Sequence, residues 1–183
     1  DLSFSDLLGA NFTNAKLSYV DFTGSNLSGV IFTGAYIENV SFSNSTIYGT
    51  KFVGTYLEKS IFDNSQINSA LFLGSKINDS SFNDVLIQNT DFSGSLITNV
   101  DLSNHNFSNN VFQNTMLNSA NLSNSNFSNS DFSYASLNSA NLSNSIFIDS
   151  NFFMTDFGSA NLSNTNLLGA NLVKSYFKNT ILD

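Results

Sequence analysis

The chain has 183 residues, 41% of them hydrophobic, so it is long enough for one domain with a sizeable core and is not disordered by composition. It contains no Cys, Pro, Trp or Arg, which excludes disulfides, thiol nucleophiles and thiolate metal sites. Six Lys against 14 Asp and Glu give a net charge of −8, which argues against direct nucleic-acid binding because phosphate contacts require clustered cations. No apolar run approaches the ~20 residues of a membrane-spanning helix, so membrane insertion is not expected.

A five-residue repeat runs without interruption along the whole chain. Residues whose numbers end in 2 or 7, from Leu2 to Leu182, are Phe, Leu or Ile at all 37 positions. Numbers ending in 5 or 0 are small: from Ser5 to Thr180, 34 of 36 are Ala, Ser, Thr or Val. Numbers ending in 4 or 9 hold 9 of the 10 Gly and 14 Asn. Because Gly and Asn accept left-handed backbone angles, this slot predicts a corner.

A period of five fits neither a helix, where such positions would spiral around the axis, nor a long strand, where they would alternate between faces. It is satisfied if each pentapeptide forms one short extended side and then turns. The large and small residues then point inward and the other three point outward. Four sides make one coil, and successive coils pair through parallel backbone hydrogen bonds. The pattern therefore predicts an all-β, parallel solenoid with no loops or insertions.

The segments ANLSN at 120–124 and 140–144, GANFT at 9–13 and GANLV at 169–173 resemble the A(D/N)LXX signature of the pentapeptide repeat family. The resemblance covers the whole chain. It implies a right-handed quadrilateral β-helix with about 20 residues per coil. About nine coils at the ~4.8 Å strand spacing would make a rod of roughly 44 Å.

With about 20 residues per coil, positions twenty apart lie above one another. One column is a continuous Phe ladder from Phe12 to Phe152, and the opposite column holds Phe from Phe22 to Phe82. Near residues 102–107 the second set of Phe residues moves to an adjacent face, starting at Phe107. The two misfits of the small slot, His105 and Asn110, lie at this change. The pattern indicates a packing seam there, and a bend in the rod would be compatible with it.

His105 is expected to face inward, with its ring satisfied by backbone groups, since buried polar groups are usually hydrogen-bonded. A pH-sensing or metal-binding role is the alternative. One His without Cys cannot build a transition-metal site unless carboxylates complete it. We therefore expect neither a metal nor a cofactor.

No catalytic constellation is apparent. The single His is predicted to face inward, the Ser residues belong to the repeat, and no Gly-rich phosphate-binding motif is present. Catalysis usually needs a concave pocket, and an unbroken square rod is expected to have none. The sequence predicts that the protein is not an enzyme.

The outward slots are mostly polar, with one apolar exception on two neighbouring faces. We call this set the apolar strip; it comprises Ile31, Tyr36, Val53, Tyr56, Leu71, Leu73, Leu96, Val111 and Met116. Contiguous exposed apolar area usually marks an interface. Scattered apolar residues on a surface with few charges are the alternative interpretation.

Two functions remain open. The first is a structural or protein-interaction module, in which residues 1–183 form one β-helix that we expect to be part of a longer chain. Its support is that the repeat runs to both ends without a capping helix, which also allows end-to-end or side-on self-association. The family includes bacterial effectors in which such a β-helix precedes a ubiquitin-ligase domain. The compartment stays open between bacterial cytoplasm and secretion.

The second function, implied by the same resemblance, is an acidic mimic of DNA that binds DNA gyrase or topoisomerase, as quinolone-resistance pentapeptide proteins do. The charge density is low for this function. Duplex DNA of ~44 Å carries roughly 26 phosphates, whereas the chain offers 14 acidic residues spread over all faces.

Overall fold

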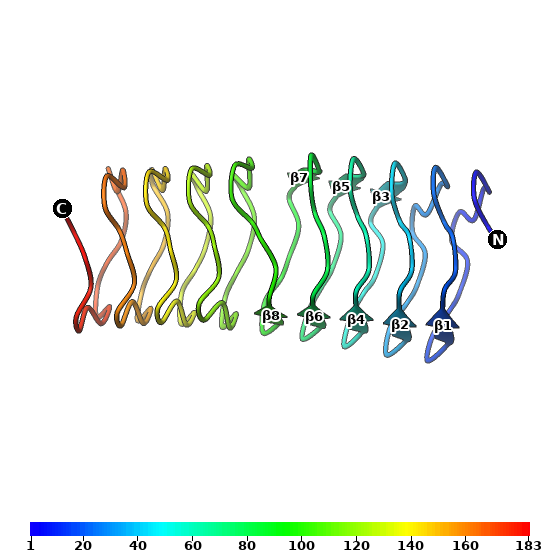
Figure 1. Cartoon of the computed structure of the whole chain (residues 1–183), viewed down its shortest axis with the longest axis horizontal. Coiled ribbons are helices and arrows are strands. Elements are labelled where there is room, and N and C mark those ends of the chain that lie inside the picture. The colour runs from blue at the N-terminus through cyan, green and yellow to red at the C-terminus, as the bar shows by residue number, and fades with distance from the viewer.

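The computed structural model describes residues 1–183 as a straight-sided rod of stacked coils, with the two termini at opposite ends (Figure 1). All regular elements are strands, so the fold is an all-β parallel solenoid. No helix is present that could cross a membrane.

Eight three-residue strands form two parallel sheets along the first half of the rod. The five-stranded sheet has the order β1-β2-β4-β6-β8 and the three-stranded sheet has the order β3-β5-β7. Partners are 20 residues apart, as in Tyr36↔Tyr56. The strands are β1 (Lys16–Ser18), β2 (Tyr36–Glu38), β3 (Thr46–Tyr48), β4 (Tyr56–Glu58), β5 (Gln66–Asn68), β6 (Lys76–Asn78), β7 (Leu86–Gln88) and β8 (Leu96–Thr98).

The ladders continue as single bridges where regular strands are absent. One column runs through Asn11, Ile31, Lys51, Leu71, Asp91, Val111, Asp131, Asn151 and Asn171. The rod therefore extends over many more coils than the strands alone would indicate.

The choice between strand and turn follows the large inward residue. All six Ile of the large slot lie at the centre of a strand, for example Ile47 in β3 and Ile97 in β8. The two remaining strands have Leu17 and Leu57 at their centres, in the same column as Ile37. Faces with Phe form tight turns instead. β-Branched side chains favour extended backbone, which accounts for the position of the sheets.

The core follows the predicted register. Every large-slot residue from Phe22 to Leu162 is buried, and so is every small-slot residue from Ser25 to Ala160 except His105. Phe residues stack along their columns, as in Phe52 on Phe72, with ring centroids 4.6 Å apart. They also meet edge to face across the rod, as in Phe52 and Phe62 at 5.9 Å.

The predicted corners are confirmed. Every position ending in 4 or 9, from Phe4 to Asn179, has a positive φ angle. Most of these positions hold Gly, Asn or Asp, which adopt this backbone conformation most readily.

Candidate interaction surfaces

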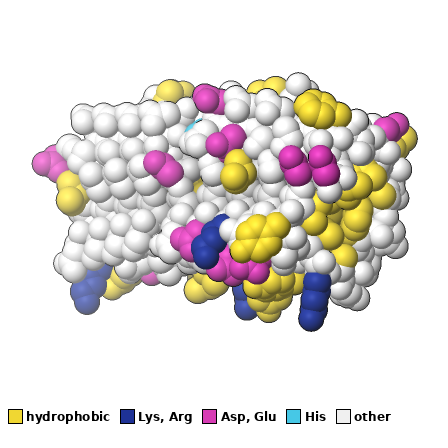
Figure 2. All heavy atoms as spheres, turned by 45° about the vertical axis from the view of Figure 1, so that its right-hand side comes forward, with side chains coloured by type: hydrophobic (Ala, Val, Ile, Leu, Met, Phe, Trp, Pro, Cys, Tyr) yellow, Lys and Arg dark blue, Asp and Glu magenta, His cyan; other side chains and the backbone are white.

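The apolar strip lies on two faces that meet at one corner of the rod. Tyr36, Tyr56 and Met116 are exposed, whereas the other six residues are half-buried. Figure 2 shows one face of the rod, on which hydrophobic and charged side chains gather toward the N-terminal part.

Two tyrosines form the centre of the strip. Tyr36 in β2 and Tyr56 in β4 pair directly, with ring centroids 6.3 Å apart. Lys76 of β6 lies over the Tyr56 ring, its Nζ 4.7 Å from the centroid, and donates a hydrogen bond to the Tyr56 hydroxyl at 3.3 Å. The charge of Glu38, then burial and the charge of Glu58, raise the pKa of Tyr36. The Tyr36 hydroxyl therefore stays protonated and neutral at physiological pH.

A column of glycines joins the two faces of the strip. Gly54 and Gly74 occupy the corner between the half-buried Val53 and Leu73 on one face and the tyrosines on the other. A Cβ at either glycine would meet no atom within 4 Å, so packing does not require glycine there. The corner lacks side chains, and the two apolar faces lie next to each other without a polar ridge between them.

The strip is interrupted by charged residues. Lys51 stands between Ile31 and Leu71 in their column, and Asp91 stands between Leu71 and Val111. The continuous apolar part is therefore limited to the region around Val53, Leu73 and the two tyrosines.

The sequence pattern did not predict a second apolar cluster. Tyr134 and Phe153 meet edge to face at 5.5 Å, and Met154 is exposed beside them. Tyr134 and Met154 hold positive φ angles of 61° and 57°, which bulky residues rarely adopt. Phe153, one of only two Phe residues outside the large slot, was the signal in the sequence.

The backbone ladder is broken on two faces of the rod, at the point where the Phe columns change. In the preceding coil, Phe62 and Asn64 donate their N–H groups to Ser81 and Asn83 at 2.8 and 2.9 Å. One coil later, the N–H groups of Phe82, Asp84, Ile87 and Asn89 find no backbone acceptor. We call the break between residues 80–89 and 101–109 the seam.

The other two faces hold the two parts of the rod together. Bridges join Asp91 to Val111 and Leu96 to Met116. The rod is therefore open along residues 80–89 and held together on the other side by these bridges, beyond which the Asn99 N–H and the Val100 carbonyl also lack a backbone partner. A small apolar gap inside the core, lined by Phe82, Phe107 and six other large-slot residues, accompanies the opening.

The two misfits of the small slot compensate for the break. In a regular coil, the carbonyls of Ser103 and Ser108 would accept hydrogen bonds from Asp84 and Asn89. Instead, the Nδ1 atom of His105 contacts the Ser103 carbonyl, and Nδ2 of Asn110 donates to the Ser108 carbonyl at 3.3 Å. Their side chains thus satisfy carbonyls that the ladder leaves free.

Asn110 also ties the two coils together. Its Oδ1 accepts a hydrogen bond from the Thr90 N–H at 2.7 Å, across the seam, and its Nδ2 donates to the Phe107 carbonyl at 2.9 Å. The side chain is buried, and both ends are used. His105 makes no such contact with the preceding coil.

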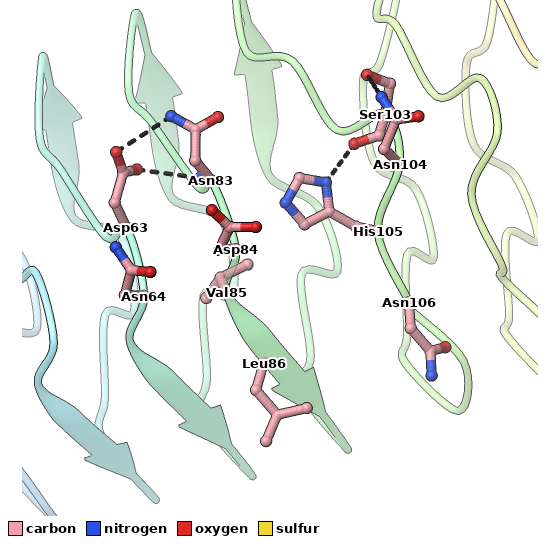
Figure 3. Close-up of a pocket in the computed structure, with 10 residues that line it drawn as sticks. All are labelled: Asp63, Asn64, Asn83, Asp84, Val85, Leu86, Ser103, Asn104, His105 and Asn106. Carbon is pink, nitrogen blue, oxygen red and sulfur yellow. Dashed lines mark hydrogen bonds between the residues drawn. The ribbon is translucent and has the colours of Figure 1, made fainter.

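Two expectations are wrong at the seam. His105 is only half-buried, because the backbone ladder to the preceding coil is broken beside it. The rod also has a hollow, with a volume of about 750 Å³. Figure 3 shows Asp63 and Asp84 on one side of it and His105 on the other, with the imidazole extending into the space between.

The hollow is acidic. Asp63 accepts hydrogen bonds from the Asn83 N–H at 3.0 Å and from its Nδ2 at 3.1 Å. The Asp84 carboxylate has no hydrogen-bond or ion-pair partner. None of the ten lining residues is Lys or Arg. No group of three or more His, Asp or Glu side chains in the structure is arranged to hold a metal ion.

The sequence profile named Pentapeptide repeats matches eight copies, over residues 1–34, 111–152, 125–164 and 150–183. These segments cover more than half of the chain. The chain belongs to the pentapeptide repeat family.

Solved structures of other pentapeptide repeat proteins are similar to this one. QnrB1, a plasmid-mediated fluoroquinolone resistance protein, has 19% sequence identity and a TM-score of 0.54, over 91% of this chain and 84% of its own. HetL, involved in heterocyst differentiation regulation in the cyanobacterium Nostoc, has 17% sequence identity and a TM-score of 0.45, over 98% of this chain and 87% of its own.

A pentapeptide repeat protein from the thylakoid lumen of Arabidopsis thaliana has 24% identity and a TM-score of 0.44, over 56% of this chain and 68% of its own. A comparison with curated protein sequences gave no match. At these identities the likeness concerns the fold alone. The family profile leaves residues 35–110 unmatched, the segment that contains β2 to β8 and the seam.

Proposed function

We propose that this pentapeptide repeat rod is a non-enzymatic protein-interaction module that binds a protein partner through the apolar strip. The observation that carries the proposal is the paired Tyr36 and Tyr56, beside Val53 and Leu73 across a corner free of side chains. Tyrosine supplies large contact area with little entropy to lose, and such residues dominate association when they lie at the centre of a patch.

The fold suits this function because the strip is preorganised. On the two faces of the strip, backbone hydrogen bonds join each coil to the next, so the strip loses little backbone freedom when a partner binds. Lys76, Glu38 and Glu58 surround the tyrosines and form a charged rim. A charged rim around an apolar centre is the usual arrangement of a protein interface.

The test is a double substitution, Tyr56→Ser with Leu73→Ser. If the strip is the interface, the double variant weakens association by about 2 kcal/mol or more and leaves folding intact. The matched control is Tyr48→Ser with Ile61→Ser, which removes one exposed Tyr and one exposed aliphatic side chain from other faces. Partners are captured from bacterial and host-cell lysates, and self-association is measured by analytical ultracentrifugation.

The DNA-mimic alternative predicts a different result. Replacing outward carboxylates, for example Asp21, Asp63 and Asp101 by Asn, would then weaken binding more than the strip variant, and binding would fall steeply with salt. If the strip variant keeps every partner that the control keeps, the strip is not the interface.

A further inference from the structure

We propose that the seam is a second binding site, which accepts an extended basic segment of a polypeptide as an added parallel β-strand. This site lies on the faces opposite the paired side of the seam and is separate from the apolar strip. It does not depend on the function proposed for the strip.

The first argument is the unpaired backbone along residues 80–85. The N–H groups of Phe82 and Asp84 have no acceptor, and the carbonyl of Ser80 accepts no hydrogen bond. At the other interior coils of this face, the two N–H groups pair with the next coil, as they do at Phe62 and Asn64, and among the equivalent carbonyls only that of Val100 is also left free. An unpaired edge of this kind is the surface to which an extended peptide adds in β-augmentation.

The second argument is that side chains already occupy part of the far edge, where the N–H and carbonyl groups of Asp101 and Asn106 are the backbone groups left without a partner. On the far side of the seam, His105 and Asn110 already contact the carbonyls of Ser103 and Ser108. The near edge has no such substitute. A peptide would therefore pair with residues 80–85, parallel to them, in the place that the next coil takes elsewhere in the rod.

The third argument is space and charge. The hollow of about 750 Å³ lies within the ~300–1,000 Å³ range of ligand sites. Asp63 and Asp84 line it, and Asp84 has no partner. From Lys76 to Lys174 the chain contains no other Lys or Arg but seven Asp. A strand that carries Lys or Arg side chains complements this surface, and an acidic strand is repelled.

The test uses the whole chain and a nine-residue peptide of alternating Lys and Val, with both termini blocked and a fluorescent label. Anisotropy titration is expected to show saturable binding. The same peptide N-methylated at every second residue should bind more than tenfold more weakly, because methylation removes the N–H groups that a strand donates. An alternating Glu and Val peptide should not bind.

Two matched variants locate the site. Asp84→Asn keeps a residue suited to positive φ and should weaken the Lys–Val peptide about fivefold, the upper range for one exposed ion pair. Asp149→Asn, the same change at a corner far from the seam, should leave binding unchanged. The strip variant Tyr56→Ser with Leu73→Ser should also bind the peptide normally, so failure at one site is distinguishable from failure at the other.

Hydrogen exchange completes the test. Binding should protect the amides of Phe82 and Asp84 and leave those of Phe62 and Asn64 unchanged. The proposal is overturned by no binding at about 1 mM peptide, by equal binding of the N-methylated peptide, or by protection elsewhere on the rod.

Discussion

The two halves of the rod solve the same packing problem differently. Before the seam, Phe residues occupy opposite faces and meet across the axis, as Phe32 and Phe42 do at 5.8 Å. After it, they occupy adjacent faces, as Phe112 and Phe127 do at 5.8 Å. Both arrangements bury two Phe residues per coil. The seam lies where the first arrangement changes to the second.

A change from turn to strand does not by itself break the ladder. At Leu27 and Ile47, a turn in one coil gives way to strand β3 in the next, and the hydrogen bond from the Leu27 N–H to Thr46 stays at 2.8 Å. At Ile87 and Phe107, strand gives way to turn while a Phe ring also enters the column, and the ladder opens. At Ile97 and Leu117, strand gives way to turn without a new Phe, and the Ile97 N–H bond stays at 3.0 Å although the Asn99 N–H loses its acceptor. The comparison indicates that the exchange of Phe columns opens the ladder more widely than the loss of a strand alone.

The largest effect is expected from the regular core. Phe72 is buried between Phe52 and Phe92, so Phe72→Ala should lower the free energy of unfolding by ~3–5 kcal/mol. Phe82→Ala should cost less, because Phe82 stacks on Phe62 alone and borders the gap in the core. Urea denaturation measures both. Equal losses would mean that the seam is packed as tightly as the rest of the rod.

Ser93→Ala is the control for the inward and outward register. Ser93 lies one residue beyond the core Phe92, and its hydroxyl donates only to Asp91. The loss in unfolding free energy should be under ~0.5 kcal/mol, as for other surface substitutions. A loss as large as that of Phe72→Ala would contradict the register.

A smaller effect than that of Phe72→Ala is expected at the seam itself. Asn110→Ala removes the acceptor of the Thr90 N–H inside the core and should cost about 1–3 kcal/mol. His105→Ala should cost less, because its ring is half-buried and does not reach across the seam. Thermal unfolding followed by circular dichroism compares the two variants. A greater loss of stability for His105→Ala than for Asn110→Ala would mean that His105, and not Asn110, ties the two coils together.

The smallest effect is a pH dependence in the first half. Hydrogen bonds from the Thr23 hydroxyl and N–H lower the pKa of Asp21, the N–H lying 2.8 Å from its Oδ1. A lowered pKa adds stability above the ordinary pKa of the group, and this stability is lost as the pH falls through the folded-state pKa. Asp21→Asn should therefore be slightly less stable than the parent at neutral pH and equal to it in strong acid. Urea titrations at several pH values measure both proteins. If the difference in unfolding free energy between Asp21→Asn and the parent is the same from neutral pH to strong acid, the lowered pKa of Asp21 is contradicted.

Much of the fold was readable from the sequence because one repeat determines it. The large slot, the small slot and the corner each require one type of residue, and none of the 37 large positions departs from its type. The position of the seam was also readable, from His105, Asn110 and the shift of the Phe columns.

The opening at the seam was not readable in the same way. Sequence columns show which side chains stack, but not whether the backbone between them still pairs. His105 was therefore expected to be buried, and the hollow beside Asp84 was not foreseen. The cluster of Tyr134 and Phe153 was missed for a related reason, since corner residues were assigned to turns and not considered as contacts.

Hydrogen exchange of the free protein tests the seam most directly. The amides of Phe82, Asp84 and Asn89 occupy the same repeat positions as those of Phe62, Asn64 and Ser69, which donate hydrogen bonds of 2.8–3.0 Å. The first three should exchange fast, at rates set by exposure alone, and the second three should be protected to nearly the stability of the whole rod. Equal protection in the two sets would mean that the ladder is closed in solution, and the division of the rod at the seam would be wrong.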